Sequence, residues 1–177
     1  MTDTNIPSKD QCLEILKKHN TPPQVIQHCL CVTKIAEEFC QRISDIDIQL
    51  VIAGSMLHDI GRSVSHSIFH AVKGAAILED ERINPRILSI VLKHIGTGIT
   101  EEEASEFGLP SHDYLPQTAE ELIVSYSDNL ACGIRKCTFE ETLENFIEKF
   151  GSESHVVKGF YKQRELIEKM ISRGKKI

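Results

Sequence analysis

The sequence predicts an all-α fold, a compact single-domain bundle of about seven to nine helices. Three features of the chain carry this prediction. Apolar residues recur every three or four positions along most of its length, as they do on one face of a helix. Helix start and stop signals separate these stretches. No segment alternates like a half-buried strand, and no Asn-Gly or Asp-Gly hairpin dipeptide occurs.

The expected elements follow one another through mostly short connections. We expect helices over residues 9–18, 22–42, 47–60, 68–80, 85–95, 101–107, 118–132, 139–150 and 154–172. Several begin at a hydroxyl side chain that can accept a hydrogen bond from a first-turn amide. A Glu or Gln three residues later completes a capping box in these pairs: Ser8 with Gln11, Thr21 with Gln24, Thr100 with Glu103, Thr118 with Glu121, and Thr138 with Glu141.

Proline and glycine mark further helix ends. Pro22 and Pro85 suit a first helical position. Glycines follow the periodic stretches, as stop signals would, at positions 61, 96, 108 and 151. The segment from 96 to 117 holds only one short helix and is longer than most connections. We expect it to be either a lid over a binding site or a mobile surface excursion.

The composition is that of one ordinary globular domain. The chain has 177 residues, of which 41% are hydrophobic and 26% charged, and this suits one domain over residues 1–177 with a stable core. The net charge of −6 disfavours wide, non-specific binding of nucleic acid. No apolar run approaches the roughly 18 residues that cross a bilayer, and the N-terminus lacks the pattern of a signal peptide. We therefore expect a cytoplasmic protein with no membrane contact.

The six cysteines, at positions 12, 29, 31, 40, 132 and 137, form no Cys-x-x-Cys pair. Most fall on apolar helical stripes, where a thiol behaves as a small hydrophobic group. We expect them to be reduced core residues. The alternative, a structural zinc site that combines Cys29 and Cys31 with Cys132 and Cys137, has an unusual ligand spacing in its Cys-x-Cys half.

Three polar residues, His28, His94 and Asp128, each fall on the apolar face of an expected helix. A single inward histidine is more often a hydrogen-bonded core residue than a ligand, and a single aspartate near a helix end is more often a cap. A buried carboxylate, however, needs a cation, hydrogen-bond donors or a proton. Asp128 therefore requires a polar environment inside the bundle.

His58 and Asp59 fall in the last turn of the almost wholly apolar helix expected at 47–60. Adjacent helical residues point about 100° apart, so such a pair holds one ion best at a helix end. His70 follows, with Gly74 one turn later, where a neighbouring element could approach closely. Inward polar residues from five helices would be costly unless they met at one centre, and we predict that they meet.

The other histidines are expected at helix ends or in loops, where they face solvent. These are His19, His66, His112 and His155. His66 is close enough in sequence to His70 to be the alternative member of the predicted centre.

With these residues, the sequence resembles the HD-domain superfamily of metal-dependent phosphohydrolases, which is named for its adjacent His-Asp pair. The resemblance extends from about His28 to Asp128 and rests on "MLHDIGR", "HAVKGAAIL", "IVLKHIG" and "IVSYSDNLA". The compact form is similar to small stand-alone HD proteins of archaea. The "HDIG" and "HAVKGA" segments are similar to the HD portion of ribonuclease Y.

The resemblance implies a set of metal ligands. It makes His28, His58, Asp59 and Asp128 ligands of a first ion, with Asp59 bridging to a second ion held by His70 and His94. The chemistry agrees, because a carboxylate has two oxygens and can span ions about 3.5–4 Å apart, whereas imidazole offers one lone pair. The metal-site core would cover about 22–132, with helices 139–172 packed on it.

The chain departs from the family pattern at two places. Many members carry lysine after "HDIG", where this chain has Arg62, which keeps the cation in a fork that matches phosphate. Many two-metal members, including signalling phosphodiesterases, have a His-His pair where this chain has His94 and Ile95. Mixed nitrogen and oxygen ligands suit Mn, Fe, Ni, Co or Zn, with Mg as a further candidate. One or two divalent ions are expected.

The function implied by the resemblance is hydrolysis of a phosphomonoester or phosphodiester by metal-activated water. Asp59 and Arg62 are the expected catalytic residues, Arg62 by neutralising phosphoryl charge or, alternatively, by capping the preceding helix. A nucleotide or related small molecule is favoured over RNA by the acidic charge. Two alternatives are a di-iron oxygenase on the same fold and a non-catalytic, metal-stabilised module.

Overall fold

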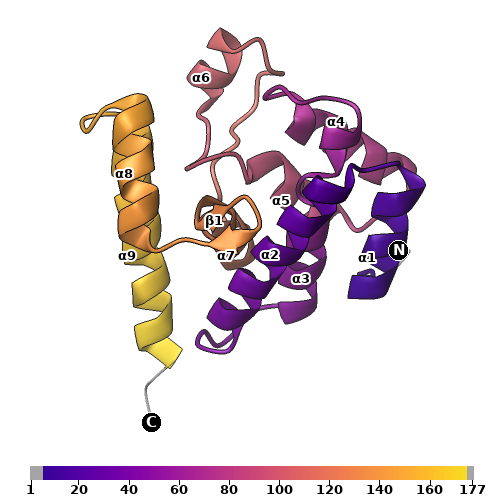
Figure 1. Ribbon diagram of the computed structural model, residues 1–177, viewed down its shortest axis with the longest axis horizontal. Coiled ribbons are helices and arrows are strands. Elements are labelled where there is room, and N and C mark those ends of the chain that lie inside the picture. The colour runs from indigo at the N-terminus through magenta and orange to yellow at the C-terminus, as the bar shows by residue number, and fades with distance from the viewer. Residues whose placement is uncertain (1–5, 175–177) are drawn as a thin grey trace.

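The computed structural model describes residues 6–174 and contains nine α-helices within that range (Figure 1). The predicted all-α bundle is therefore confirmed. A 3-10 turn, η1 (Ile60–Ser63), follows the third helix. The helices are α1 (Lys9–Lys18), α2 (Pro23–Cys40), α3 (Ile48–Leu57), α4 (His70–Asp80), α5 (Pro85–Lys93), α6 (Glu101–Glu106), α7 (Ala119–Asn129), α8 (Phe139–Phe150) and α9 (His155–Gly174).

The capping boxes were predicted correctly at Ser8, Thr100, Thr118 and Thr138. The prediction for Thr21 was wrong. Its amide still bonds to a carbonyl at the end of α1, and its Oγ1 is buried without a hydrogen-bond partner among residues 6–174. The next residue, a proline, takes the N-cap position of α2 with no side-chain hydrogen bond.

Two expected helices end three residues earlier than predicted. The helix expected at 47–60 ends at Leu57, and the one expected at 118–132 ends at Asn129. The residues after Asn129 form a small antiparallel hairpin of β1 (Ala131–Cys132) and β2 (Arg135–Lys136), which was not predicted. With strands of only two residues, no alternating pattern can develop.

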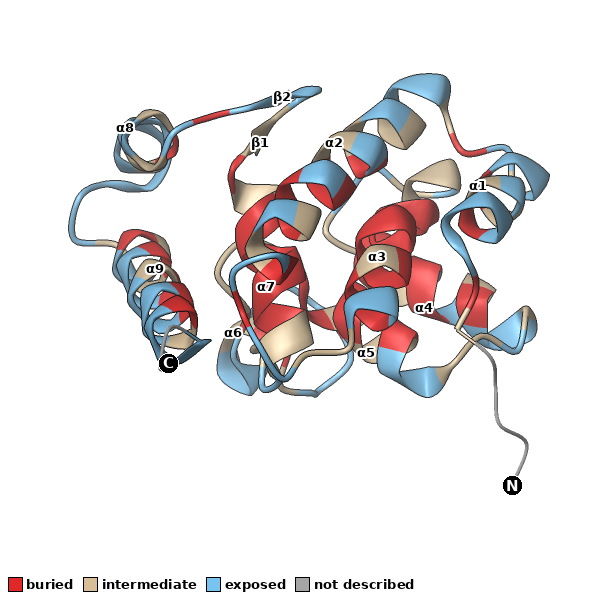
Figure 2. Cartoon of the chain, turned by 90° about the horizontal axis from the view of Figure 1, so that it is seen from below, coloured by how far each residue is buried: buried red, intermediate tan, exposed pale blue. Residues whose placement is uncertain are grey.

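The centre of the bundle is α3, and α2, α5 and α7 pack around it (Figure 2). Seven of its ten residues are buried, which agrees with its apolar sequence. Gly54 of α3 lies against Ile90 of α5, where an added Cβ would come within 2.7 Å of the isoleucine side chain. The helix axes are therefore close at this crossing, and the last turn of α3 is held firmly in the core.

The C-terminal helices α8 and α9 lie at one side of the bundle (Figures 1 and 2), and an aromatic cluster connects them to it. Phe160 of α9 is fully buried in the main core. Its ring stacks on Phe139 with centroids 4.6 Å apart and contacts Tyr126 of α7 at 5.6 Å. Aromatic pairs at such distances stabilise the fold by more than the burial of their surface area alone. This contact anchors α9 beside α7.

Two glycines bring α4 against the turn that follows α3. A Cβ on Gly61 would lie 1.9 Å from the carbonyl oxygen of His70, and a Cβ on Gly74 would lie 3.1 Å from the amide nitrogen of Gly61. Gly61 was expected as a helix stop signal, but its importance is this close approach. Gly74 has the role that its spacing suggested. Together they bring His70 next to the end of α3.

The structure corrects the expectation that all six cysteines are reduced. Cys132 and Cys137 form a disulfide, because the hairpin brings their Cα atoms to 5.8 Å. Cys12, Cys29 and Cys40 are free and buried, as expected, and Cys31 is free and half-buried. Since Cys132 and Cys137 are bonded to each other, the alternative zinc site is excluded.

The segment expected to be a lid or an excursion packs on its own small core. Ile99, Ala104, Leu109 and Tyr114 are buried together against side chains of α4 and α5.

Among the helices of residues 6–174, none has the length and apolar character needed to cross a membrane.

Candidate metal centre

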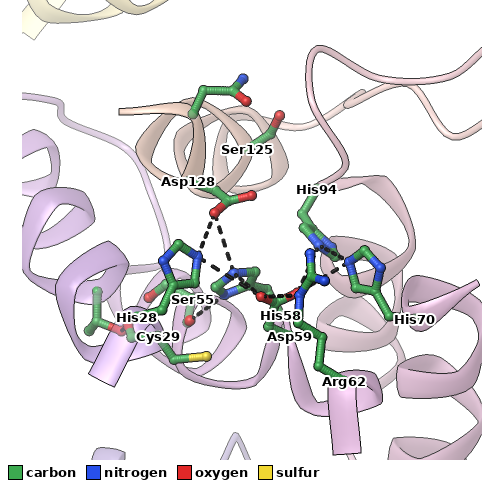
Figure 3. A network of polar contacts seen from close by, with 12 residues as sticks. His28, Cys29, Ser55, His58, Asp59, Arg62, His70, His94, Ser125 and Asp128 are labelled. Atoms are coloured by element: carbon green, nitrogen blue, oxygen red, sulfur yellow. Dashed lines mark hydrogen bonds and ion pairs between the residues drawn. The ribbon is translucent and has the colours of Figure 1, made fainter. Parts of the chain in front are cut away.

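The six residues proposed as ligands from the sequence lie together inside the bundle (Figure 3). His58 and Asp59 come from the end of α3, at the centre of the group. His28 on α2 and Asp128 on α7 lie on one side and are called the outer pair. His70 on α4 and His94 after α5 lie on the other side and are called the inner pair. Five separate segments thus meet at one point.

The two oxygens of Asp59 face different pairs. Its Oδ1 lies 3.1 Å from His70 Nε2 and 3.5 Å from His94 Nε2. Its Oδ2 lies 3.7 Å from His58 Nε2 and 3.9 Å from His28 Nε2. One carboxylate therefore spans the whole centre, with one oxygen directed to each side.

Asp128 completes the outer side. Its Oδ1 lies 2.9 Å from His28 Nε2 and 3.5 Å from His58 Nε2. Two sets of three donor atoms are close enough together to hold one ion each: His28, His58 and Asp128, and His58, Asp59 and His94. His58 belongs to both sets and is fully buried.

Each of the four histidines has its Nδ1 next to a backbone carbonyl. The acceptors are Gly133 for His28 at 2.7 Å, Ser55 for His58 at 2.8 Å, Ser67 for His70 at 2.8 Å, and Val91 for His94 at 2.7 Å. A carbonyl oxygen can only accept, so Nδ1 carries the proton and Nε2 of a neutral ring offers a lone pair. This arrangement is typical of histidines that bind metal through Nε2.

The Nε2 lone pairs and the Asp59 carboxylate lie so close together that a cation between them would be stabilising. His70 Nε2 and His94 Nε2 lie 3.0 Å apart, and both face the Asp59 carboxylate. Acceptors at such distances repel one another unless a cation or proton lies among them. In addition, His58 Nε2 and Asp59 Oδ1 are buried without a hydrogen-bond partner in the described part of the chain, a costly state unless another group binds them. The donor set of imidazole and carboxylate fits a divalent transition metal.

The carboxylates and the imidazoles of the centre shift one another's pKa values toward the charged forms. Burial opposes ionisation of Asp59, but the nearby imidazoles of His58, His70 and His94 hold the pKa of this carboxylate far below the usual range. Burial likewise opposes ionisation of Asp128, and its histidine neighbours lower its pKa. Burial disfavours charge on His58 as well, yet the two carboxylates raise its pKa well above 6.5, whereas burial lowers the pKa of His94. The two carboxylates therefore favour the charged form of His58.

Arg62 lies at the open edge of the centre. Its Nε donates to Asp59 Oδ2 at 2.6 Å, so the guanidinium contacts the central carboxylate and does not act as a simple helix cap. An open cavity of about 270 Å³ begins here, and its lining is Gln24, Val25, His28, Asp59, Arg62 and Gly133. No residue of the 96–117 segment lines this cavity, so the structure gives no support to a lid over it.

The other histidines lie away from the centre. His66 is exposed, so the structure brings His70 and not its alternative to the site. His112 is also exposed, and His155 pairs with Glu103. His19 is half-buried and contacts Glu81, the residue just after α4, at 2.7 Å.

A polar network behind the centre was not predicted. Gly96, two residues after His94, accepts hydrogen bonds from Ser125 Oγ at 3.0 Å and Asn129 Nδ2 at 2.7 Å. Gln163 of α9 accepts from Asn129 and donates to Ser125. The network links the backbone next to His94 with the turn that carries Asp128. The sequence signal for this network is Gln163, which falls on the otherwise apolar face of α9 formed by Val157, Phe160, Ile167 and Ile171.

Comparison with known proteins agrees with this architecture. Residues 25–132 match the family model described as HD domain. A tRNA (cytidine(56)-2'-O)-methyltransferase of Thermoplasma volcanium is 42% identical over 144 residues, which are 81% of this chain but 42% of that protein. An uncharacterized protein of Methanocaldococcus jannaschii is 40% identical over 153 residues, or 84% of this chain and 90% of that one. This chain thus spans less than half of the methyltransferase.

More distant proteins are also similar to this chain. Ribonuclease Y of Nitratidesulfovibrio vulgaris is 25% identical over 138 residues, which cover 77% of this chain and 23% of that enzyme. The HD domain of the Listeria monocytogenes phosphodiesterase PgpH, solved with cyclic-di-AMP, superimposes with a TM-score of 0.62 at 20% identity and covers 91% of this chain and 92% of that one. The family match, the helical order and the adjacent His58 and Asp59 together show that this chain belongs to the HD-domain family.

Proposed function

We propose that this protein is a metal-dependent phosphohydrolase that holds two divalent ions. His28, His58, Asp59 and Asp128 would hold the first ion, and Asp59, His70 and His94 the second. The observation that carries the proposal is the position of Asp59, whose two oxygens face opposite histidine pairs. When bound, such ions lower the pKa of a bound water and neutralise charge on phosphoryl oxygens.

The residues of the chain supply binding and orientation. Carbonyl acceptors at Nδ1 fix the four rings with Nε2 toward the carboxylates. Arg62 donates to Asp59 through Nε and also lines the cavity. A guanidinium in this place would bind a substrate phosphate and neutralise the charge that develops on it.

A small phosphorylated substrate, such as a nucleotide, fits the site best. The cavity of about 270 Å³ is at the low end of the size of small-ligand sites, and the chain carries a net charge of −6. RNA is the second candidate. It is favoured by relatives that carry the names of a tRNA methyltransferase and ribonuclease Y.

An activity panel tests the proposal. The protein is stripped with a chelator and reloaded separately with Mn²⁺, Fe²⁺, Co²⁺, Ni²⁺, Zn²⁺ or Mg²⁺. Each form is assayed on mononucleotides, cyclic dinucleotides, a generic phosphomonoester, short RNA and tRNA, and metal content is measured by elemental analysis. Metal-restored release of phosphate or cleavage of a diester supports the proposal.

Two outcomes of the same panel argue against the proposal, and a third would change only the substrate class. Oxygen consumption by the iron form without phosphoester cleavage would indicate an oxygenase. Bound metal that raises the melting temperature, with no turnover on any substrate, would indicate a structural module. Activity on tRNA or RNA alone would move the substrate class from small molecules to nucleic acid.

A further inference from the structure

The hairpin β1–β2 lies at the mouth of the metal centre and begins three residues after Asp128. Ala131 pairs with Lys136, and Cys132 with Arg135. Gly133 at the turn adopts a positive φ of 68°, and the disulfide from Cys132 to Cys137 closes the loop. The backbone tip of this hairpin lines the same cavity as His28 and Arg62.

His28 differs from the other three histidines in what orients it. The acceptors of His58, His70 and His94 lie three residues earlier in the same segment, so the local backbone sets those rings. The acceptor of His28 is the carbonyl of Gly133, 105 residues away. The orientation of this one ring therefore depends on where the hairpin holds that carbonyl.

The base of the hairpin is held by the backbone hydrogen bond from Cys137 N to Leu130 O at 2.8 Å and by packing against α2, but its tip has few other restraints. Its strands have two residues each, and short two-stranded hairpins are marginal in water. Its tip is exposed, with Ile134 at 65%. The ion pairs of Arg135 with Glu141 and of Lys136 with Glu38 are on the surface, where such pairs contribute little. The Cys132–Cys137 bond is the main covalent restraint on the tip.

We propose that the Cys132–Cys137 disulfide positions His28 through the carbonyl of Gly133, and that its reduction weakens metal binding at the outer pair. The inference rests on the proposed function in one respect, the role of His28 as a ligand. Loss of a hydrogen-bond partner behind a ligating histidine typically lowers metal affinity about 10–100-fold. We expect a change at the lower end of this range, because the reduced hairpin still samples its native shape.

The redox step requires a dithiol reductant. Its thiolate attacks Cys132, which is half-buried, whereas Cys137 is buried. A mixed disulfide forms at Cys132 and Cys137 leaves as a thiolate that takes up a proton. The second thiol of the reductant then displaces Cys132, which also takes up a proton. Two electrons reduce the disulfide to two thiols, and the reductant ends as its own disulfide.

Binding of Mn²⁺, followed by the electron paramagnetic resonance signal of the free ion, tests the proposal. Mn²⁺ prefers oxygen and nitrogen ligands, so newly formed thiols do not compete. Metal-free protein is compared before and after reduction with a phosphine that is then removed without air. Thiol titration in denaturant verifies the two states: four free cysteines in the oxidised chain and six in the reduced one.

We expect reduction to weaken Mn²⁺ binding by about tenfold in the wild type. The double variant Cys132→Ser/Cys137→Ser should bind as weakly as the reduced wild type, with or without phosphine. The matched control is Cys31→Ser, a free half-buried thiol on α2, which should keep the full response. Equal affinity of oxidised and reduced wild type, or six titrating thiols before reduction, would overturn the proposal.

Two further measurements separate this proposal from the proposed function. In metal-free protein, the His28 Nδ1 proton should be visible by nitrogen–proton correlation in the oxidised form and lost or shifted on reduction, while that of His94 is unchanged. His28→Ala should bind Mn²⁺ weakly in both redox states. If His28→Ala binds normally, the ligand assignment fails. If His28→Ala binds Mn²⁺ weakly but the affinity of the wild type is unchanged by reduction, only the hairpin proposal fails.

Discussion

The outer and inner pairs of the metal centre differ in exposure and in support. The side chains of His28 and Asp128 are 19% and 20% exposed, and those of His70 and His94 are 6% and 2% exposed. The inner histidines are oriented by carbonyls of their own segments, whereas His28 depends on the hairpin. The outer pair is thus more accessible to solvent, and the inner pair is held more rigidly by its own segments.

This difference assigns separate roles to the two sides. The inner pair lies among packed side chains behind the close contact of Gly61 and Gly74, so an ion held there is shielded from solvent. The outer pair borders the cavity that also reaches Arg62. Substrate and exchangeable metal should therefore meet the protein on the outer side, while the inner side stays constant.

The largest effect is expected from Asp59→Asn, because the two oxygens of Asp59 face the two pairs. Removing its charge should release both ions and reduce turnover by at least about 10³-fold. Elemental analysis and steady-state rates measure the two effects. Asp80→Asn, an exposed position on α4, serves as control and should keep both. Full activity of a folded Asp59→Asn protein would remove the bridging role.

The next effect separates the two pairs directly. His28→Ala and His94→Ala should each lose one ion per chain and reduce turnover by about 10²-fold, less than Asp59→Asn. In the wild type, a chelator should remove the outer ion first, since its ligands are more exposed. Stopped-flow chelation with an indicator dye would show two phases, and His28→Ala should lack the fast one. A fast phase that instead disappears in His94→Ala would reverse the assignment.

Arg62 tests the outer side without changing a ligand. Arg62→Ala should lower kcat/KM about 10²-fold with metal content and melting temperature unchanged. Arg62→Lys should restore part of this loss, because it keeps the charge but not the two-pronged contact. Equal kcat/KM in all three proteins would remove Arg62 from the site. A fall in melting temperature alone would indicate a structural role through Asp59.

The pH dependence of metal binding should follow His58. Its pKa in the metal-free protein lies well above 6.5, so an entering ion must displace a proton, and affinity should rise about tenfold per pH unit until that pKa is passed. The folded protein also gains stability from this raised pKa below pH 6.5 and loses it as pH rises through the raised value. Isothermal titration in buffers of different ionisation enthalpy counts the released proton, and zero protons at pH 6.5 would contradict this assignment.

The lowered pKa values of Asp59 and Asp128 act at the acid end. They contribute stability above their ordinary value of 3.8, and the contribution is lost as pH falls through the lowered values. The metal-free protein should therefore melt highest between about pH 4 and 6.5, and bound metal should extend this range upward as it replaces the proton on His58. Thermal melts with and without metal across pH measure the shift.

The smallest effect concerns the network behind the centre. Gln163→Leu should leave Ser125 and Asn129 short of partners and lower the free energy of unfolding by about 1–3 kcal/mol, with a smaller loss of metal affinity. Glu165→Gln, exposed on the same helix, is the control and should change neither. An unchanged denaturation midpoint in Gln163→Leu would show that the network contributes little.

The helices and the polar residues that point into the bundle could be predicted from patterns along the chain. Capping boxes such as that at Thr118 and the apolar stripe around His28 depend on neighbours within four positions, so a single chain displays them. The His58-Asp59 pair at the end of an apolar helix and the resemblance to the HD family led to the same six residues. These features are local, or are kept in order along the chain.

How those residues face one another depends on tertiary packing and could not be predicted from the chain. The two directions of the Asp59 oxygens, the contact of Arg62 with Oδ2 and the exposure of the outer pair depend on how five segments pack. The hairpin escaped prediction because its strands are too short to show a period, and with it the disulfide and the Gly133 carbonyl behind His28. A contact across 105 residues has no local signature, since packing and not periodicity brings its two ends together.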